Sequence, residues 1–518
     1  MQSTSEKSVY SDSSTGPIPI DGPGSISRAL PQSRLATLSG FGRSSTVASY
    51  VWRPSTLDQL RALILKAETN ALPLTLRGSG RSYGDAATNA ESMVVDLRRL
   101  NRVLAWDPDT GEISLEPGVT IEQLWRTTIE DGWWPPVVPG TMAPTIGGCL
   151  AMNIHGKNGR QVGVLGDHVT SIDLMISSGE VRTCSLTENS DLFRGAIGGF
   201  GLLGAIVRVT IQMKRIFSGR LEVRAEPTPT LDAMLDAIDE KSTRTDYVVG
   251  WVDGFARGSR LGRGVLHEAR HLSEGEDPDS TKTLGMEFQT LPSTILGVIP
   301  KSVVGPMMRP FLMRPGIRFL NGLKYRASRL FDKGIPFSQS HAAFAFLLDY
   351  VPGWQKAYGP SGLVQYQLFL PKATASTIFR FVLEETKKAG LPSFLAVVKR
   401  HRADEFLISH GVDGFSLALD FKVDRRFRKK GPALFDRLTE EIVDAGGRFY
   451  LAKDSILSSS AARRYLGNDT LATFAALKSQ VDPRGIFESD LARRLFGASN
   501  NGPTTIFEPP SIDNQGTS

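Results

Sequence analysis

The side chains best suited to chemistry in this sequence are His155 and Lys157, at the end of a glycine-rich stretch over residues 139–158. A neutral imidazole can accept or relay the proton of a hydroxyl group. A lysine two residues later can hold a negative charge, such as an alkoxide or a phosphate. An isolated histidine is more often a buried core residue, so this interpretation depends on what surrounds the pair.

The stretch before this pair has the composition of a loop that approaches a ligand closely. Glycine has no Cβ, so its main chain can lie against a flat or phosphorylated ligand, and the exposed amides of such a turn attract anions. The alternative is an ordinary glycine-rich turn. The residues predicted to contact a cofactor here are Gly140, Thr141, Thr145, Gly147, Gly148, Asn153, His155 and Gly156.

A second glycine loop lies about sixty residues upstream, in Arg77-Gly-Ser-Gly-Arg-Ser-Tyr-Gly-Asp85. It resembles a Rossmann fingerprint, and Asp96 imitates the ribose-binding acid of that motif. The match fails because Tyr83 occupies the third glycine position and the following polar stretch is not typical of a closely packed helix. The cofactor contacts predicted in this loop are Gly78, Ser79, Gly80, Arg81, Ser82 and Tyr83.

Composition limits the remaining classes of function. The chain has 518 residues, 41% of them hydrophobic, with a net charge of +6, which predicts a soluble protein of two to three domains. Mild basicity without Lys/Arg clusters suits an anionic ligand or a membrane surface and argues against nucleic-acid binding. Two cysteines exclude a disulfide framework, and the scattered histidines predict no metal site.

The order of elements indicates an α+β fold. We expect helices from residue 55 and residue 120, each with a capping pattern, and strands at 72–76, 93–97, 113–116 and 205–213. Residues 169–185 predict a hairpin. Further strands at 247–252, 363–370, 394–398 and 415–423, with a helix at 373–389, indicate a second, inserted domain.

One basic segment has an unusual composition. No acidic residue occurs between Glu287 and Asp332, whereas seven lysines and arginines alternate there with apolar residues. Any long helix is expected to be broken by Pro300, Pro306, Pro310 and Pro315. Residues 288–331 are therefore predicted either to contact a membrane interface or to form a flap over the domain core. We expect neither a signal peptide nor a transmembrane helix, so the predicted location is cytoplasmic or peripheral to a membrane.

The two glycine loops together resemble the FAD-binding domain of the vanillyl-alcohol-oxidase superfamily (PCMH type). The closer resemblance is to the decaprenylphosphoryl-β-D-ribose 2-oxidase family, and it covers about residues 35–496. The motifs that carry it include Pro139-Gly-Thr141, Gly198-Gly199, Gln365-Tyr-Gln367, Leu419-Asp-Phe421 and Gly446-Gly-Arg-Phe-Tyr-Leu-Ala-Lys-Asp-Ser455.

This resemblance implies a two-subdomain FAD-binding domain at 35–222, a substrate (cap) domain at 223–447 and a segment at 448–497 that returns to the FAD domain. Residues 1–34 and 498–518 are predicted to be disordered tails. Many relatives carry a flavin-linking histidine in the first loop, and Arg81 stands at that place, so FAD is predicted to be non-covalent. Ala418 replaces a cysteine that mycobacterial members carry and that covalent inhibitors attack.

The resemblance also implies the reaction. We expect FAD-dependent oxidation of the C2 hydroxyl of a polyprenyl-phosphoryl-β-D-ribose to the ketone, followed by an NAD(P)H-dependent reductase partner that completes an epimerisation. Lys453, His155 and Lys157 are the expected catalytic residues. The expected substrate-binding residues are Gln365, Gln367, Lys399 and Tyr450. The alternative is an aldonolactone or alditol oxidase that acts on a soluble sugar.

Overall fold

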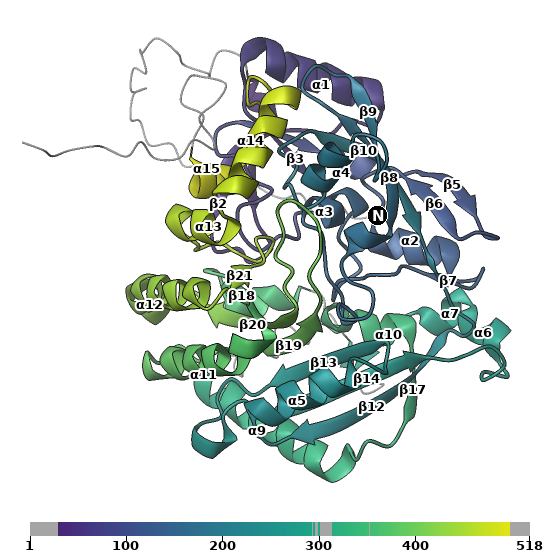
Figure 1. The fold of residues 1–518 in the computed structure, drawn as a ribbon, viewed down its shortest axis with the longest axis vertical. Helices are drawn as coiled ribbons and strands as arrows, with labels where there is room; N and C mark the ends of the chain where they lie inside the picture. The colour runs from purple at the N-terminus through teal and green to yellow at the C-terminus, as the bar shows by residue number, and fades with distance from the viewer. Residues whose placement is uncertain (1–29, 293, 296–298, 301–312, 352, 498–518) are drawn as a thin grey trace, which may run out of the picture.

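The computed structural model describes residues 30–497, except 293, 296–298, 301–312 and 352, and it confirms the α+β class (Figure 1). Two smaller sheets form the upper half in Figure 1, and one large sheet forms the lower half. The expected N-terminal tail lies mostly outside the described residues, as does the C-terminal one. Leu30 is buried and Gln32–Arg34 form a 3-10 turn, so the ordered chain begins before residue 35.

The first sheet has the strand order β1-β2-β4-β3, in which β2 and β3 both run parallel to β4. Its strands are β1 Leu35–Ser39, β2 Thr46–Trp52, β3 Leu74–Arg77 and β4 Met93–Asp96. Helix α1 (Leu57–Asn70) connects β2 to β3 and is capped by Thr56, whose side chain accepts from the amide of Gln59. Leu60, Ile64 and Ala67 form its buried side.

The second sheet is antiparallel, with the order β5-β6-β10-β8-β9. Its strands are β5 Val103–Asp107, β6 Glu112–Leu115, β10 Ala205–Gln212, β8 Val169–Met175 and β9 Val181–Cys184. The predicted hairpin is the β8–β9 pair. The capping box predicted at Thr120 and Gln123 is present at the start of α2 (Ile121–Thr128). Helices α3 (Ile146–Ala151) and α4 (Ser190–Ala196) and the strand pair β7 (Trp133–Trp134) and β11 (Lys214–Arg215) complete this half.

Asp96 ends β4 and has a local role. Its carboxylate accepts from the amide of Arg98 and pairs with the side chains of Arg98 and Arg53. These contacts hold the pKa of the carboxyl below its usual value although burial opposes them. The similarity to a ribose-binding acid is therefore fortuitous.

The third sheet has eight strands in the order β17-β12-β14-β13-β19-β20-β18-β21, all antiparallel to their neighbours. Its strands are β17 Phe337–Ser340, β12 Arg220–Thr228, β14 Gly264–His271, β13 Tyr247–Val252, β19 Ala396–His401, β20 Gly414–Lys422, β18 Leu363–Pro371 and β21 Arg448–Phe449. The helices α5 (Leu231–Lys241), α11 (Lys372–Lys388) and α12 (Arg425–Asp444) lie on its outer side, and the opposite face is turned toward the glycine loops (Figure 1).

The structure describes the second part of the basic segment, residues 313–331, and this part is helical from Arg314 onward. Helix α9 (Arg314–Phe331) has 18 residues, so the expectation that Pro315 breaks a long helix is wrong. Pro315 stands in the first turn, where its missing N–H has no intrahelical partner to lose. Shorter elements precede and follow α9 along the chain. They are α6 Ser280–Leu284, α7 Met286–Gln289, β15 Thr294–Ile295, β16 Ile299–Pro300, α10 His341–Ala345, and the 3-10 turns Leu347–Tyr350 and Trp354–Tyr358.

The last described residues return to the first sheet. They form α13 (Ser459–Leu466), α14 (Asn468–Val481) and α15 (Asp490–Phe496), beside β3 and α1 in Figure 1. Phe487 forms a parallel bridge with Leu74, and the buried Lys478 ammonium donates to the carbonyls of Leu202 and Phe487 and pairs with Asp482. Nowhere in the part of the chain that the structure describes is a helix long and apolar enough to cross a bilayer.

Candidate active site

The two glycine loops meet at one wall of a cavity of about 400 Å³. A Cβ on Gly78 would lie 2.1 Å from Oγ1 of Thr145, so glycine at position 78 lets the loops touch. The predicted cofactor residues on this wall are Gly78, Ser79, Gly80, Arg81, Ser82, Tyr83, Gly140, Thr141, Thr145, Gly148 and His155.

Three predicted cofactor residues, Gly147, Asn153 and Gly156, lie outside the cavity lining. The amide of Gly147 donates to the carbonyl of Pro117, and Asn153 takes a left-handed conformation (φ 41°) while its side chain accepts from the amide of Gly166. A Cβ on Gly156 would lie 2.3 Å from Oδ1 of Asn158. In the structure all three positions therefore have a packing role.

All seven residues predicted for catalysis or substrate binding line the same cavity. They come from the end of the second loop, from the inner strands of the large sheet and from the turn after β21: His155, Lys157, Gln365, Gln367, Lys399, Tyr450 and Lys453. Gln365 and Gln367 share one face of β18, as the period of two in a strand predicts. Lys399 lies in the middle of β19 rather than at its end, because this strand runs to His401.

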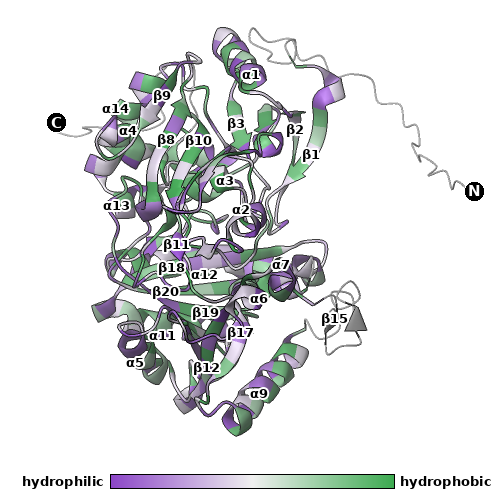
Figure 2. Cartoon of the chain, turned by 90° about the vertical axis from the view of Figure 1, so that its right-hand side faces the viewer, coloured by the Kyte–Doolittle hydropathy of each residue, from purple (hydrophilic) through white to green (hydrophobic). Residues whose placement is uncertain are grey.

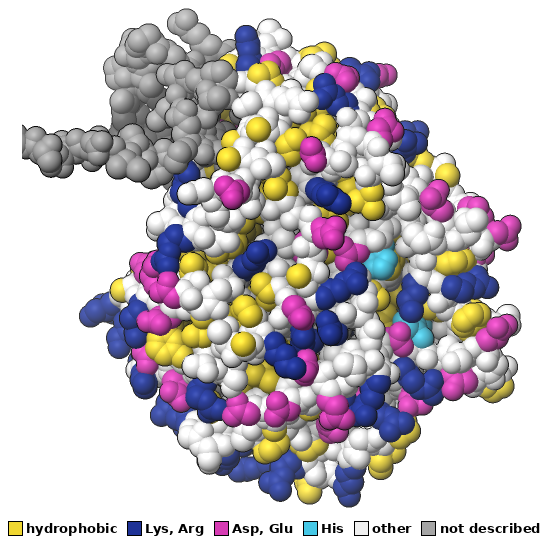
Figure 3. All heavy atoms as spheres, in the orientation of Figure 1, with side chains coloured by type: hydrophobic (Ala, Val, Ile, Leu, Met, Phe, Trp, Pro, Cys, Tyr) yellow, Lys and Arg dark blue, Asp and Glu magenta, His cyan; other side chains and the backbone are white. Residues whose placement is uncertain are grey.

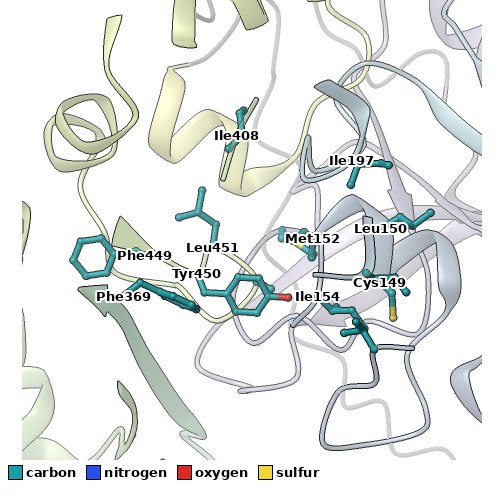
Figure 4. Packing of buried hydrophobic residues seen from close by; sticks show 14 of the residues in the cluster. Cys149, Leu150, Met152, Ile154, Ile197, Phe369, Ile408, Phe449, Tyr450 and Leu451 are labelled. Atoms are coloured by element: carbon teal, nitrogen blue, oxygen red, sulfur yellow. The ribbon is translucent and has the colours of Figure 1, made fainter. Parts of the chain in front are cut away.

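The turn that carries Tyr450 and Lys453 joins the two halves. The amide of Tyr83 in the first glycine loop donates to the carbonyl of Ala452 at 2.8 Å, and the amide of Tyr450 donates to the carbonyl of Gln367 at 3.2 Å. Figure 4 shows the Tyr450 ring reaching from this turn toward Ile154 on the second loop. The Lys453 ammonium lies 3.8 Å from the centre of the Tyr83 ring.

His155 is buried and both ring nitrogens have neighbours. The side-chain nitrogen of Gln367 lies 2.9 Å from Nε2, and Nζ of Lys399 lies 3.5 Å from Nδ1. The rings of His401, His410 and Tyr450 surround it at 4.9–5.5 Å between ring centres. Burial, and then the positive charge of Lys399, lower the pKa of His155 well below its usual value. The imidazole is therefore neutral at physiological pH.

Three lysines of the cavity share one electrostatic property. Burial lowers the pKa of Lys157 to about 7 and that of Lys399 to about 8. Burial also lowers the pKa of Lys453 to about 7, although the carboxylate of Asp420 opposes this shift. Lys157 is held by the carbonyls of Phe344 and Ala345 and lies over the Phe344 ring. Near neutral pH each amine can gain or lose a proton at low free-energy cost.

Asp420 lies next to Gln365 on the neighbouring strand and was assigned no role from the sequence. It is paired with Gln365 across β18 and β20, accepts a hydrogen bond from the Gln365 side chain and has one buried oxygen without a partner. Burial raises its pKa to about 6. The sequence contained one signal for a role of this residue, an acid inside the apolar strand Phe415-Ser-Leu-Ala-Leu-Asp-Phe421. Burying an ionised group in such a strand costs free energy unless the group has a partner. Trp251, His267 and Lys324, which unlike Asp420 line the cavity, were also assigned no role from the sequence.

The glycine-loop wall fits the flavin dinucleotide that the resemblance implies. A Cβ on Gly140 would have only the side chain of Leu348 within 4 Å, at 3.4 Å, so this part of the wall is open main chain. Arg81 is exposed on the first loop, 5.3 Å from the centre of the Phe41 ring, and an arginine cannot form the histidyl link to flavin. Among the described residues, no cluster of three or more His, Cys, Asp or Glu side chains is arranged to hold a metal ion.

Comparison with known proteins agrees with this geometry. A family model described as an FAD binding domain matches residues 48–185. The chain is 30% identical over 462 residues to decaprenylphosphoryl-β-D-ribose oxidase of Mycolicibacterium smegmatis, across 88% of this chain and 97% of that protein.

Lactone oxidases match a shorter part. D-arabinono-1,4-lactone oxidase of Yarrowia lipolytica is 25% identical over 39% of this chain and 38% of its own length, and L-gulonolactone oxidase of Mus musculus is 26% identical over 38% and 43%. The long match, unlike the short ones, spans both halves of the molecule. The chain is therefore an FAD-dependent oxidoreductase that belongs to the decaprenylphosphoryl-β-D-ribose oxidase family.

Proposed function

We propose that this enzyme oxidises the C2 hydroxyl of a polyprenyl-phosphoryl-β-D-ribose to the ketone, as the first half of a ribose-to-arabinose epimerisation. The observation that supports this most is the charge of the cavity. Every Lys, Arg, Asp or Glu that lines it in the described part of the chain is basic: Arg81, Lys157, Lys324, Lys399 and Lys453. Four of these are lysines that come from outside the first glycine loop, and they suit a substrate that carries its own phosphate.

The large sheet supplies the groups that would hold the sugar. We assign residues 223–447 to the substrate domain and 448–497 to a segment that completes the FAD domain. Gln365 and Gln367 offer amides to the ribose hydroxyls from one strand face, and Tyr450 offers a phenol from the following turn. Lys157 and Lys399 would neutralise the phosphate. We base these roles on the position and the chemistry of each side chain, and substitution of each residue tests its role.

Lys453 is our candidate for the group that takes the hydroxyl proton. Bound FAD supplies the two-electron acceptor for the hydride of the carbinol carbon. A base with a pKa near the working pH serves best, and Lys453 satisfies this condition. His155 has a neighbour at each ring nitrogen and a strongly lowered pKa, so we assign it to positioning Gln367 and Lys399. The ammonium formed on Lys453 would stay beside the reacting oxygen and stabilise negative charge there.

Anaerobic bleaching of the flavin absorbance tests the substrate. The holoenzyme is mixed with polyprenyl-phosphoryl ribose, free ribose, gulonolactone or sorbitol at equal concentration. We expect rapid bleaching with the phosphorylated lipid-linked ribose alone. Rapid bleaching by gulonolactone or sorbitol would instead establish the alternative, an aldonolactone or alditol oxidase, and would refute the proposal.

The ketone is the second feature to check. Mass spectrometry of the anaerobic product should show a loss of two hydrogens, and borodeuteride reduction should place the deuterium at C2. An epimerisation then needs a separate NAD(P)H-dependent reductase that returns the inverted alcohol. Adding such a reductase with NAD(P)H should convert the product to the arabinose form, whereas label at another carbon would remove the C2 assignment.

A further inference from the structure

Helix α9 (Arg314–Phe331) has a buried inner face and a second, exposed apolar face, which is unusual for a surface helix. One face packs inward with Ile317, Asn321, Tyr325 and Ser328, which are buried at the spacing of helical turns. It is anchored to the large sheet, because the side chain of Asn321 donates to Asp253 at 3.1 Å and the Arg263 side chain lies over the Tyr325 ring. The core therefore explains only this inner face.

The outer face carries a second apolar stripe. Phe319, Leu323 and Leu330 are 65%, 53% and 66% exposed, and they recur after four and seven residues, so they lie along one side of the helix. Exposed apolar residues continue at both ends, at Met313, Phe331, Ile335 and Phe337. A single exposed leucine needs no explanation, whereas a contiguous stripe of this length marks a contact surface.

The charges within helix α9 all have one sign. Within α9 the charged side chains are Arg314, Arg318, Lys324, Arg326 and Arg329, and the helix contains no Asp or Glu. Arg314 is 3.3 Å from Asp424 and so is partly neutralised. In Figure 2 α9 lies at the lower edge, away from the FAD-binding half, and Figure 3 shows blue basic side chains beside yellow apolar ones along this edge.

We propose that the outer stripe of α9 inserts into the interface of an anionic lipid bilayer, with its arginines on the headgroup phosphates. An apolar face bordered by cations has this chemistry. Docking of a second copy is disfavoured, because it would bring two sets of arginines together without opposing acids. The bilayer is therefore the one occupant that satisfies both the apolar residues and their charge.

The same helix reaches the cavity. Lys324 lines it, and its ammonium lies 4.3 Å from the centre of the Trp251 ring on β13. A bilayer in contact with α9 would therefore lie beside the cavity, where a lipid-linked sugar phosphate could enter while its chain stays in the membrane. This second step rests on the proposed function, whereas the bilayer contact does not.

Vesicle flotation tests the contact directly. The FAD-loaded full chain is mixed with vesicles of phosphatidylcholine containing about a third phosphatidylglycerol, and with pure phosphatidylcholine vesicles. We expect binding to the anionic vesicles that weakens as salt is raised. The triple variant Phe319→Ser, Leu323→Ser, Leu330→Ser should bind roughly 100-fold more weakly, since each immersed side chain contributes several-fold to tenfold.

Two controls separate the explanations. Leu186, 62% exposed in the other half, gives the matched variant Leu186→Ser, which should bind vesicles like the wild type. Flavin reduction by a short-chain, water-soluble phosphoryl ribose should be unchanged in the triple variant, which shows that it is folded and active. Equal vesicle binding by the triple variant and the wild type would overturn the proposal, and so would a wild-type dimer that the triple variant loses.

The outcomes for the two proposals are independent. Vesicle binding without flavin reduction by any phosphoryl ribose would retain the membrane contact and end the proposed reaction. Flavin reduction by the soluble analogue without any vesicle binding would do the reverse.

Discussion

Replacing Asp420 by Asn should shift the pH dependence of flavin reduction toward acid. The carboxylate is fully buried, keeps one oxygen without a partner, and favours the ammonium form of Lys453. Asparagine keeps an oxygen that can accept from Gln365 but removes the charge. Without that charge, burial and the Lys399 ammonium act on Lys453 unopposed, and its pKa must fall below the present value of about 7.

The size of the shift follows from the electrostatics. With a pKa of about 7, the neutral fraction of Lys453 rises from roughly 9% at pH 6 to roughly 91% at pH 8, about tenfold. Two charges a few ångström apart interact by about 3 kcal/mol at an effective dielectric constant of ~20, which is about two pH units. Allowing for relaxation, we expect the midpoint of the Asp420→Asn variant to move by about one to two units. At pH 6 this variant should then run at half or more of its own maximal rate.

Stopped-flow anaerobic reduction of the flavin is the suitable assay, because a single turnover is not masked by product release. Rates at saturating substrate are measured from about pH 5.5 to about pH 9, with each variant normalised to its own plateau. Asp404→Asn is the matched control, since Asp404 is another acid whose pKa burial raises, but it is not among the charged groups that shift the pKa of Lys453. Its profile should coincide with that of the wild type.

Two results would refute this reasoning. The first is an Asp420→Asn profile that rises at the wild-type pH, which would mean that the carboxylate does not act on the titrating group. The second is a wild-type rate that falls as pH rises through 7, which would mean that the ammonium form of Lys453 is the working form. Lys453→Met, which keeps much of the volume without a titrating amine, should lose the wild-type inflection altogether.

Other changes have equally definite outcomes. Gly78→Ala places a methyl 2.1 Å from the Thr145 hydroxyl, so urea unfolding should show a loss of stability of about 1–3 kcal/mol. Gly140→Ala should change the stability of the apoprotein by less than about 0.5 kcal/mol, but a fluorescence titration should show weaker FAD binding. Ala418→Cys should introduce a thiol that a small disulfide-forming reagent labels in the cavity, detected by intact mass, while the wild type, whose two cysteines are buried, stays unlabelled. Acid precipitation should leave the yellow flavin in the supernatant, because Arg81 cannot bond to it; colour in the pellet would contradict this. Binding of a phosphoryl ribose near pH 7.5 should make the protein take up protons, because the phosphate raises the pKa of Lys157 and Lys399. Calorimetry should detect this uptake as a binding heat that depends on the buffer, whereas free ribose should cause no uptake.

Local signals in the sequence predicted the elements well where short-range physics decides them. The capping box at Thr120 and the hairpin of residues 169–185 depend on neighbours a few positions away, and both are present. The helix expected from residue 55 is also present, although Thr56 rather than Ser55 is its cap. The alternation that placed Gln365 and Gln367 on one strand face also holds. Pro315 was misjudged because a proline's effect depends on whether it falls inside a helix or in its first turn.

The rest depends on partners distant in sequence. The neighbours of β13 in the sheet could not be predicted from local sequence. Gly250 pairs with Val398, which is distant in sequence, and no local pattern indicates this pairing. Asp420 became recognisable as a site residue only when the register placed it against Gln365. The glycines of the second loop looked alike in sequence, and only the surrounding chain distinguished Gly140 on the cavity wall from Gly147, whose amide is bonded to Pro117.

The return of the C-terminal residues to the first sheet has a consequence for how the protein is made. Leu74 bridges to Phe487, more than four hundred residues later, and Asp85 pairs with Arg494. A ribosome must therefore synthesise nearly the whole chain before the edge at β3 can be completed, while the intervening large sheet, whose strands lie between residues 220 and 449, can fold earlier. The first sheet would therefore stay incomplete until translation is nearly finished. We expect flavin to bind only after the chain has been released from the ribosome.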